Sequence, residues 1–158
     1  MTPKYPAARI QLDAVAPKPV AAVLHFERSI ELERGLHDLV SLRASQLNGC
    51  AFCIDMHWKD ARARGESEER LYMLEAWRES DLYDEREKTA LELCEAITFI
   101  ADGQVRDAVW ARVRAEFTEA EAAQLMYAIA AINTWNRLQI TSRAEPGHYQ
   151  PGDIAAVA

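Results

Sequence analysis

The chain has 158 residues, of which 49% are hydrophobic and 27% charged, with only six Gly and six Pro. This composition predicts one globular domain whose core is large enough to fold without metal or disulfide support, and the low Gly and Pro content favours helices. Eighteen Lys and Arg against 25 Asp and Glu give a net charge of −7, which argues against nucleic acid and anionic membranes as partners.

The sequence also carries signals about its compartment. No apolar run approaches the roughly 18 residues of a membrane-spanning helix, and the first residues lack the apolar stretch of a signal peptide. We therefore expect a cytoplasmic protein. Three cysteines are too few for a disulfide framework, yet Cys50 and Cys53 stand only three residues apart.

Extended structure is expected only at the start of the chain, because four of the six prolines lie within residues 1–19. From Val20 onward, apolar residues recur at helical spacing. They predict a first helix that stops near Gly35 and a second that ends at Asn48-Gly49, a pair typical of helix C-termini.

A third helix is expected from Cys50 to about Arg64. Further start signals are the N-cap Ser67 and the capping boxes Asp84 with Glu87 and Thr118 with Glu121. We find no alternating β-rich run and no linker. The expected fold is a single-domain, all-α bundle of about six to seven helices over residues 20–147, with a C-terminal tail over 148–158.

Cys50, Cys53 and His57 form the constellation that carries chemistry. Cys53 is at i+3 and His57 at i+7 from Cys50, so both thiols and the imidazole are expected on one helix face. A thiol in the first turn of a helix lies near unpaired backbone N–H groups, which stabilise a thiolate and lower the pKa below the free value of about 8.5. The pattern favours redox use of the cysteine pair.

Three other interpretations stay open at this point. A structural zinc site needs a fourth ligand, and the only other thiol is Cys94, within an apolar helical stripe. A second interpretation is a pair of inert core thiols that share this spacing by coincidence. A thioredoxin-type domain would need a βαβ pattern that this sequence lacks.

The stretch from Leu42 to His57, LRASQLNGCAFCIDMH, resembles the AhpD-like alkylhydroperoxidases of the carboxymuconolactone decarboxylase superfamily. The segments KDARARGESEERLYMLEAWRES, DEREKTALELCEAIT and AINTWNRLQI extend the resemblance over about residues 20–147. It implies an all-α fold and a peroxidase cycle that needs no cofactor beyond an external thiol reductant. Relatives commonly form trimers or hexamers, so a homo-oligomer is expected.

The resemblance also implies a role for each site residue. Cys53 matches the cysteine that attacks the peroxide, Cys50 its resolving partner, and His57 the histidine of a proton relay. Asp38, twelve residues before Cys50, matches the relay carboxylate, although the family usually has Glu there. Phe52 stands where some relatives have a His between the cysteines, which removes one hydrogen-bonding partner.

The leading hypothesis is a thiol-dependent peroxidase, an antioxidant oxidoreductase that acts on hydroperoxides. Its reductant would be a dithiol of the lipoyl type or a peroxiredoxin-like partner, by analogy with the family. A general disulfide reductase is the alternative enzyme, followed by the decarboxylase branch of the superfamily. The non-enzymatic alternative is an oligomeric redox sensor whose cysteine pair switches an interface.

Overall fold

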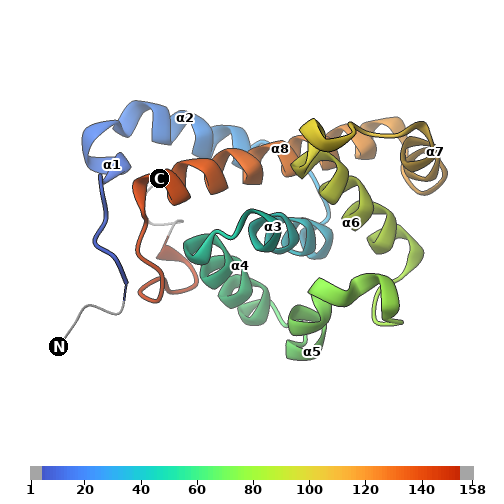
Figure 1. Ribbon diagram of the computed structural model, residues 1–158, viewed down its shortest axis with the longest axis horizontal. Helices are drawn as coiled ribbons and strands as arrows, with labels where there is room; N and C mark the ends of the chain where they lie inside the picture. Colours follow the sequence, from blue (N-terminus) through green and yellow to red (C-terminus); the bar gives the residue numbers. More distant parts are fainter. Residues whose placement is uncertain (1–4, 154–158) are drawn as a thin grey trace.

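A computed structural model describes residues 5–153 (Figure 1). This part of the chain contains eight α-helices, two 3-10 segments and no strand, which confirms the all-α class and slightly exceeds the predicted number of helices. The elements are α1 (Leu12–Val15), α2 (Pro17–Arg28), α3 (Arg34–Asn48), α4 (Ala51–Ala63), α5 (Glu68–Tyr72), η1 (Met73–Glu79), α6 (Glu85–Thr98), η2 (Ile100–Asp102), α7 (Asp107–Glu116) and α8 (Glu119–Ser142).

Helix α3 is the central element of the bundle, and it packs against α4, α6 and α8 (Figure 1). It contributes to two apolar clusters. Val40 faces the cluster formed with α6, α7 and α8, whereas Leu39 and Leu42 face the cluster formed with α4, α5, η1 and α6. Because α3 is buried on two sides, the residues at its C-terminal end are held firmly, and this end leads directly to the cysteine pair.

The helix starts predicted from capping residues are confirmed. The Ser67 side chain accepts a hydrogen bond from the Arg70 backbone N–H, which opens α5. Both capping boxes have the reciprocal bonds, Asp84 with Glu87 at the start of α6 and Thr118 with Glu121 at the start of α8. These caps satisfy backbone donors that would otherwise lack partners.

The N-terminal segment differs from the predicted extended arm. Residues 12–15 form the short helix α1, and α2 begins at Pro17 rather than near Val20. Proline is tolerated in the first turn of a helix because the backbone N–H groups there have no intrahelical acceptor. Pro17 and Pro19 therefore begin a helix instead of preventing one.

The predicted end of the first helix, near Gly35, is wrong. Helix α2 stops at Arg28, where the Ser29 hydroxyl donates to the Phe26 carbonyl at 2.7 Å, and Gly35 already belongs to α3. The apolar residues Ile30 and Leu32 suggested a longer helix, but they pack on the core from the connecting loop. Apolar spacing alone does not distinguish these two arrangements.

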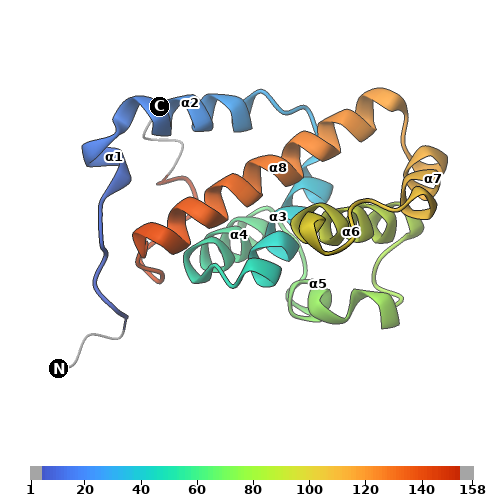
Figure 2. The same cartoon turned by 45° about the horizontal axis from the view of Figure 1, so that its top comes forward.

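Helix α2 lies on the opposite side of α8 from α3 and α4 (Figure 2). The rings of Phe26 and Tyr127 meet edge to face with centroids 6.0 Å apart, and the Trp135 indole donates to Glu27 at 2.8 Å. The preceding segment is fixed by the Arg9 backbone N–H, which donates to the Ser142 carbonyl at 2.8 Å. The N-terminal residues therefore reach the end of α8, close to the start of α4.

The segment after α8 runs along α4. The Gly147 N–H donates to Asp55 at 3.0 Å, Lys59 donates to the Tyr149 carbonyl at 3.0 Å, and the Tyr149 hydroxyl donates to Asp60 at 2.8 Å. Of the predicted tail, residues 154–158 lie outside the described part of the chain. Among the helices of residues 5–153, none is long and apolar enough to cross a membrane.

Candidate redox site

The cysteine pair lies at the turn between α3 and α4. Gly49 ends α3 with a φ of 70°, a left-handed conformation that glycine adopts without strain. Cys50 follows as the N-cap of α4, and its sulfur accepts a hydrogen bond from the Cys53 backbone N–H at 3.4 Å. The turn predicted from Asn48-Gly49 therefore places Cys50 at the helix N-terminus.

Cys50 and Cys53 are joined by a disulfide bond, and their Cα atoms are 5.3 Å apart. Both residues are only 1% exposed. When the bond is reduced, the dipole at the N-terminus of α4 favours a thiolate, and the Cys53 N–H points at the Cys50 sulfur. The position thus suits a pair that alternates between disulfide and thiolate.

A buried network of side-chain amides connects the residues just before this turn to helix α8. The Asn48 side-chain amide donates to the side-chain oxygens Oδ1 of Asn133 and Asn136, each at 3.0 Å, and the Asn136 side-chain amide donates to the Ser45 hydroxyl at 3.0 Å. Asn136 is fully buried. The polar residues inside the apolar helix α8 therefore connect it to the end of α3, one residue before the turn.

His57 follows Cys53 by one turn of α4 and is only 5% exposed. Burial lowers its pKa to about 3, with smaller contributions from the nearby His37 and the positive charge of Arg64. Its Nε2 is buried and has no hydrogen-bond partner among residues 5–153. At neutral pH the ring is therefore uncharged.

Asp38 is buried at the N-terminal end of α3 and is held by Arg64. The guanidinium donates from Nε to Oδ2 at 2.8 Å and from Nη2 to Oδ1 at 2.5 Å, a two-point pairing. Burial raises the pKa of Asp38, while the hydrogen bonds and charge of Arg64 act in the opposite direction. Both carboxylate oxygens are thus occupied by a cation from the end of α4.

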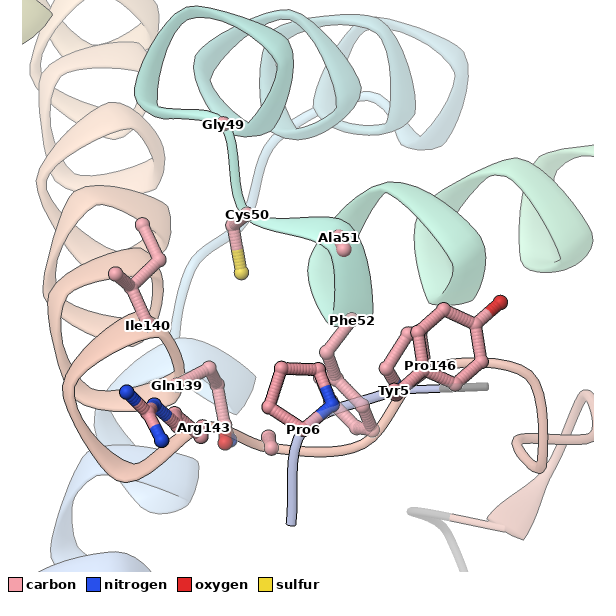
Figure 3. A pocket seen from close by; sticks show the side chains of 11 residues that line it. Tyr5, Pro6, Gly49, Cys50, Ala51, Phe52, Gln139, Ile140, Arg143 and Pro146 are labelled. Carbon is pink, nitrogen blue, oxygen red and sulfur yellow. The ribbon is translucent and has the colours of Figure 1, made fainter. Parts of the chain in front are cut away.

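Two neighbouring cavities, which share the lining residues Phe52, Gln139 and Ala144, reach the disulfide. The first, of about 220 Å³, is lined by Cys50 together with the end of α8 and the N-terminal segment (Figure 3). The Cys50 sulfur points into it, between Ile140 on one side and Phe52 on the other (Figure 3). Cys53 does not line this cavity.

The second cavity has a volume of about 380 Å³ and is lined by Cys53 but not by Cys50. Its walls come from α1, α2, α4 and α8 and include the apolar side chains of Leu24, Phe52 and Met56. Glu27 also lines it, held by the Trp135 indole. Burial raises the pKa of Glu27 above its usual value.

The third thiol is separate from this site. Cys94 is a free, fully buried residue on α6, and burial raises its pKa to about 12. It is an inert core residue, as predicted from its place in an apolar stripe. Within residues 5–153, no group of three or more His, Cys, Asp or Glu side chains is arranged to hold a metal ion.

Known proteins resemble this chain in both sequence and fold. The profile of the carboxymuconolactone decarboxylase family matches residues 20–96. The uncharacterised protein YdfG of Bacillus subtilis is 42% identical over 135 residues, which cover 84% of this chain and 92% of YdfG. The chain belongs to the carboxymuconolactone decarboxylase family. The resemblance noted from the Cys-x-x-Cys segment is thereby confirmed.

Solved structures agree with this assignment. A protein of unknown function from Agrobacterium tumefaciens, suggested to be an antioxidant defence protein AhpD, is 37% identical with a TM-score of 0.87, covering 90% of this chain and all of that one. An uncharacterised peroxidase-related protein from Silicibacter sp. TM1040 has a TM-score of 0.76 at 18% identity, covering 87% and 75% of the two chains. The second likeness concerns the fold alone. Together these findings identify an AhpD-like member of the family.

The structure brings together part of the predicted site. Cys50 and Cys53 are bonded, and His57 is buried one turn further along the same helix. Asp38 is paired with Arg64, a residue that sequence analysis did not select. Glu27 and Arg143 were also missed, because they reach the two cavities from positions far from the cysteine motif in the sequence.

Proposed function

We propose that the protein is a thiol-dependent peroxidase that reduces hydroperoxides with electrons from an external thiol. The observation that carries this proposal is the Cys50–Cys53 disulfide at the N-terminus of α4, with the two cysteines lining different cavities. Family membership supports it, since the 37% identical protein from Agrobacterium tumefaciens is suggested to be an antioxidant defence protein AhpD. No resident cofactor is required by this chemistry.

The first half of the cycle begins on Cys53. Its thiolate attacks the distal peroxide oxygen, the O–O bond breaks, and the alcohol or water that leaves takes up a proton. Cys53 becomes a sulfenic acid. The apolar wall of the larger cavity suits the organic part of a hydroperoxide, and we assign the proton relay to His57, which is uncharged and lies one turn of α4 from Cys53.

The second half of the cycle regenerates the disulfide. The Cys50 thiol condenses with the Cys53 sulfenic acid, which forms the S–S bond and releases water. The short separation of the two Cα atoms, 5.3 Å, allows this step without movement of the backbone. An external dithiol then reduces the disulfide, so the net reaction converts hydroperoxide and dithiol into alcohol, water and disulfide.

Asp38 is assigned a positioning role, unlike Cys53 and His57, which are assigned catalytic roles. Because both of its oxygens accept hydrogen bonds from Arg64, we assign it a positioning role that holds the end of α4 against α3. A direct part in the proton relay would require Arg64 to release it. Catalysis is therefore assigned to Cys53, Cys50 and His57.

The decisive experiment is a turnover assay with a hydroperoxide and excess dithiol. We expect many turnovers for wild type, whereas Cys53→Ser and Cys50→Ser lose turnover and Cys50→Ser accumulates a sulfenic acid on Cys53. His57→Gln should lower kcat/KM by about a hundredfold, the usual effect of removing a proton-transfer group. Cys94→Ser is the matched control, because it removes a thiol outside the site and should keep activity.

The same assay separates the alternatives. A redox sensor would consume one equivalent of peroxide and stop, even with dithiol present. A general disulfide reductase would reduce low-molecular-weight disulfides with turnover and leave the hydroperoxide unreacted. Full activity in Cys53→Ser would contradict the assigned order of attack.

A further inference from the structure

The two cavities that meet the disulfide differ in charge. Three acidic residues, Asp13, Glu27 and Glu145, line the cavity of Cys53, and no basic residue does. Arg143 is the one charged residue that lines the cavity of Cys50. An anion is therefore disfavoured in the cavity of Cys53 and favoured in the cavity of Cys50.

Arg143 is placed for this role by the end of α8. It is the C-cap of that helix, with a φ of 56°, and it lines the wall of the cavity into which the Cys50 sulfur points (Figure 3). Among residues 5–153, no carboxylate forms an ion pair with Arg143. In a chain with a net charge of −7, a cation without an ion-pair partner beside a reactive sulfur favours the binding of negatively charged ligands there.

The remaining wall of this cavity is compatible with a small organic anion. Gln139 adds a side-chain amide next to Arg143, and Pro6 and Phe52 supply apolar surface (Figure 3). The volume of about 220 Å³ is small compared with the pockets that hold drug-sized ligands, roughly 300–1,000 Å³. A carboxylate joined to a short thiol-bearing chain matches these dimensions and this charge.

We propose that the Cys50 cavity is the binding site for the reductant, a low-molecular-weight dithiol that carries a carboxylate, and that Arg143 binds this carboxylate. The inference rests on the proposed function, because it names the electron donor of that cycle. Peroxide and reductant then approach the disulfide through different cavities. The acidic cavity of Cys53 is left for uncharged hydroperoxides.

The reduction step follows from this placement. One thiolate of the dithiol attacks the Cys50 sulfur, the Cys50–Cys53 bond breaks, and its electron pair leaves with Cys53 as a thiolate. The second thiol of the reductant then attacks the first reductant sulfur, which is bound to Cys50 in a mixed disulfide. This releases Cys50, and the reductant departs as a cyclic disulfide that has lost two electrons and two protons.

Dihydrolipoate and dihydrolipoamide provide a matched test, because they share one dithiol and differ in whether a carboxylate is present. With wild type we expect kcat/KM for dihydrolipoate to exceed that for dihydrolipoamide by about threefold to tenfold, the range of a partly exposed charge-assisted contact. Arg143→Asn should reduce the ratio to about one without changing kcat/KM for peroxide, which reports only the oxidative half of the cycle. Asn is chosen because it tolerates the left-handed conformation of position 143.

Two control variants make the kinetic test specific. Arg143→Lys keeps the charge and should keep most of the preference for the acid. Arg114→Ala removes one positive charge from an exposed position on α7, outside both cavities, and should leave the ratio unchanged. A wild-type ratio of one, or equal losses for both reductants in Arg143→Asn, would overturn the proposal.

A second experiment is independent of peroxidase turnover. In reduced Cys53→Ser, mixed-disulfide formation at Cys50 should be faster with 3,3′-dithiodipropionate, a small dianion, than with the neutral hydroxyethyl disulfide of similar size. In Cys50→Ser, Cys53 should show the reverse preference. Mass spectrometry over time measures both rates, and the same preference at both cysteines would contradict the charge difference between the cavities. If the protein proves not to be a peroxidase, these rates still decide whether Arg143 selects anions.

Discussion

Arg64 holds Asp38 through two hydrogen bonds, from Nε to Oδ2 at 2.8 Å and from Nη2 to Oδ1 at 2.5 Å. Asp38 lies near the start of α3, and Arg64 follows the last residue of α4. Because Asp38 is only 5% exposed, the guanidinium compensates much of the cost of burying its charge. The pair connects the two helices that flank the cysteine turn, at the ends remote from that turn.

Removal of Arg64 should therefore destabilise the protein, because the buried Asp38 carboxylate loses the cation that compensates its charge. We expect Arg64→Ala to lower the free energy of unfolding by about 1–3 kcal/mol, as measured by urea denaturation at pH 7.5. Arg64→Ala combined with Asp38→Asn should recover part of the loss, because the amide carries no charge to desolvate. Arg112→Ala, which breaks the more exposed pair with Glu92, is the control and should cost less than about 1 kcal/mol. Equal losses in all three proteins would contradict the role given to the Asp38 charge.

The buried histidine gives the protein a defined pH dependence. The pKa of His57 falls from its usual 6.5 to about 3 in the folded state, and that of the neighbouring His37 falls to about 4, mainly because of burial. As the pH drops below about 6.5, the unfolded chain binds protons that the folded chain does not, so folding stability decreases. We expect the free energy of unfolding to fall between pH 6 and pH 4, with each histidine contributing up to about 1.4 kcal/mol per pH unit.

The contribution of His57 can be isolated by comparing slopes. His57→Gln should have a slope smaller by up to about 1.4 kcal/mol per pH unit between pH 6 and pH 4, because the amide does not titrate. His25→Gln, at an exposed position on α2, is the control and should keep the wild-type slope. An unchanged slope in His57→Gln would mean that this ring is protonated in the folded state.

The features predicted correctly from the sequence depend on residues that are close along the chain. The Asn48-Gly49 turn, the Cys50 N-cap position and the capping boxes involve contacts within a few residues, where side-chain chemistry and backbone conformation are directly linked. The all-α class follows from the same local patterns. The motif itself placed both sulfurs at the start of α4, as observed.

The features that were missed depend on contacts between distant segments. Arg64 is 26 residues from Asp38, and Trp135 is 108 residues from Glu27, so neither pairing has a local signal. Helical periodicity indicates which side chains are buried, but it does not indicate which buried carboxylate meets which partner. For the same reason, the sequence does not predict the opposite charges of the two cavities, because these charges depend on the packing of α2 and α8 beside the cysteine turn.

Glu27 is a half-buried carboxylate of the Cys53 cavity, and its raised pKa gives a second test by pH. The folded state holds this proton more tightly than the unfolded chain does, so wild type loses stability as the pH rises through the titration range of Glu27. Glu27→Gln keeps an acceptor for the Trp135 indole but does not ionise. We expect the variant to gain on the order of 1 kcal/mol relative to wild type at pH 8 and to lose that advantage near pH 4.

The matched control for Glu27→Gln is Glu31→Gln, which changes an exposed carboxylate just after α2. Its difference from wild type should remain within about 0.5 kcal/mol at both pH values. Thermal unfolding monitored at several pH values provides the measurement. A constant offset between Glu27→Gln and wild type from pH 4 to pH 8 would show that burial of the charge is not what destabilises this position.

Asn136 is the fully buried member of the amide network behind the cysteine turn, where it accepts from Asn48 and donates to Ser45. In Asn136→Ala both partners lose a hydrogen bond inside the core, so we expect a loss of about 2–3 kcal/mol in the free energy of unfolding. The turn that carries Cys50 should also open more often. Reduction of the disulfide by dithiothreitol should then become severalfold faster under native conditions.

The control for this effect is Thr134→Ala on the same helix. Thr134 is exposed, and its hydroxyl donates only to the Ala130 carbonyl, at 3.0 Å, so its removal should cost less than about 0.5 kcal/mol and leave the reduction rate unchanged. Stability and reduction rate distinguish two roles of the network. If Asn136→Ala is destabilised but its disulfide is reduced at the wild-type rate, the network supports packing of α8 against α3 without holding the cysteine turn in place.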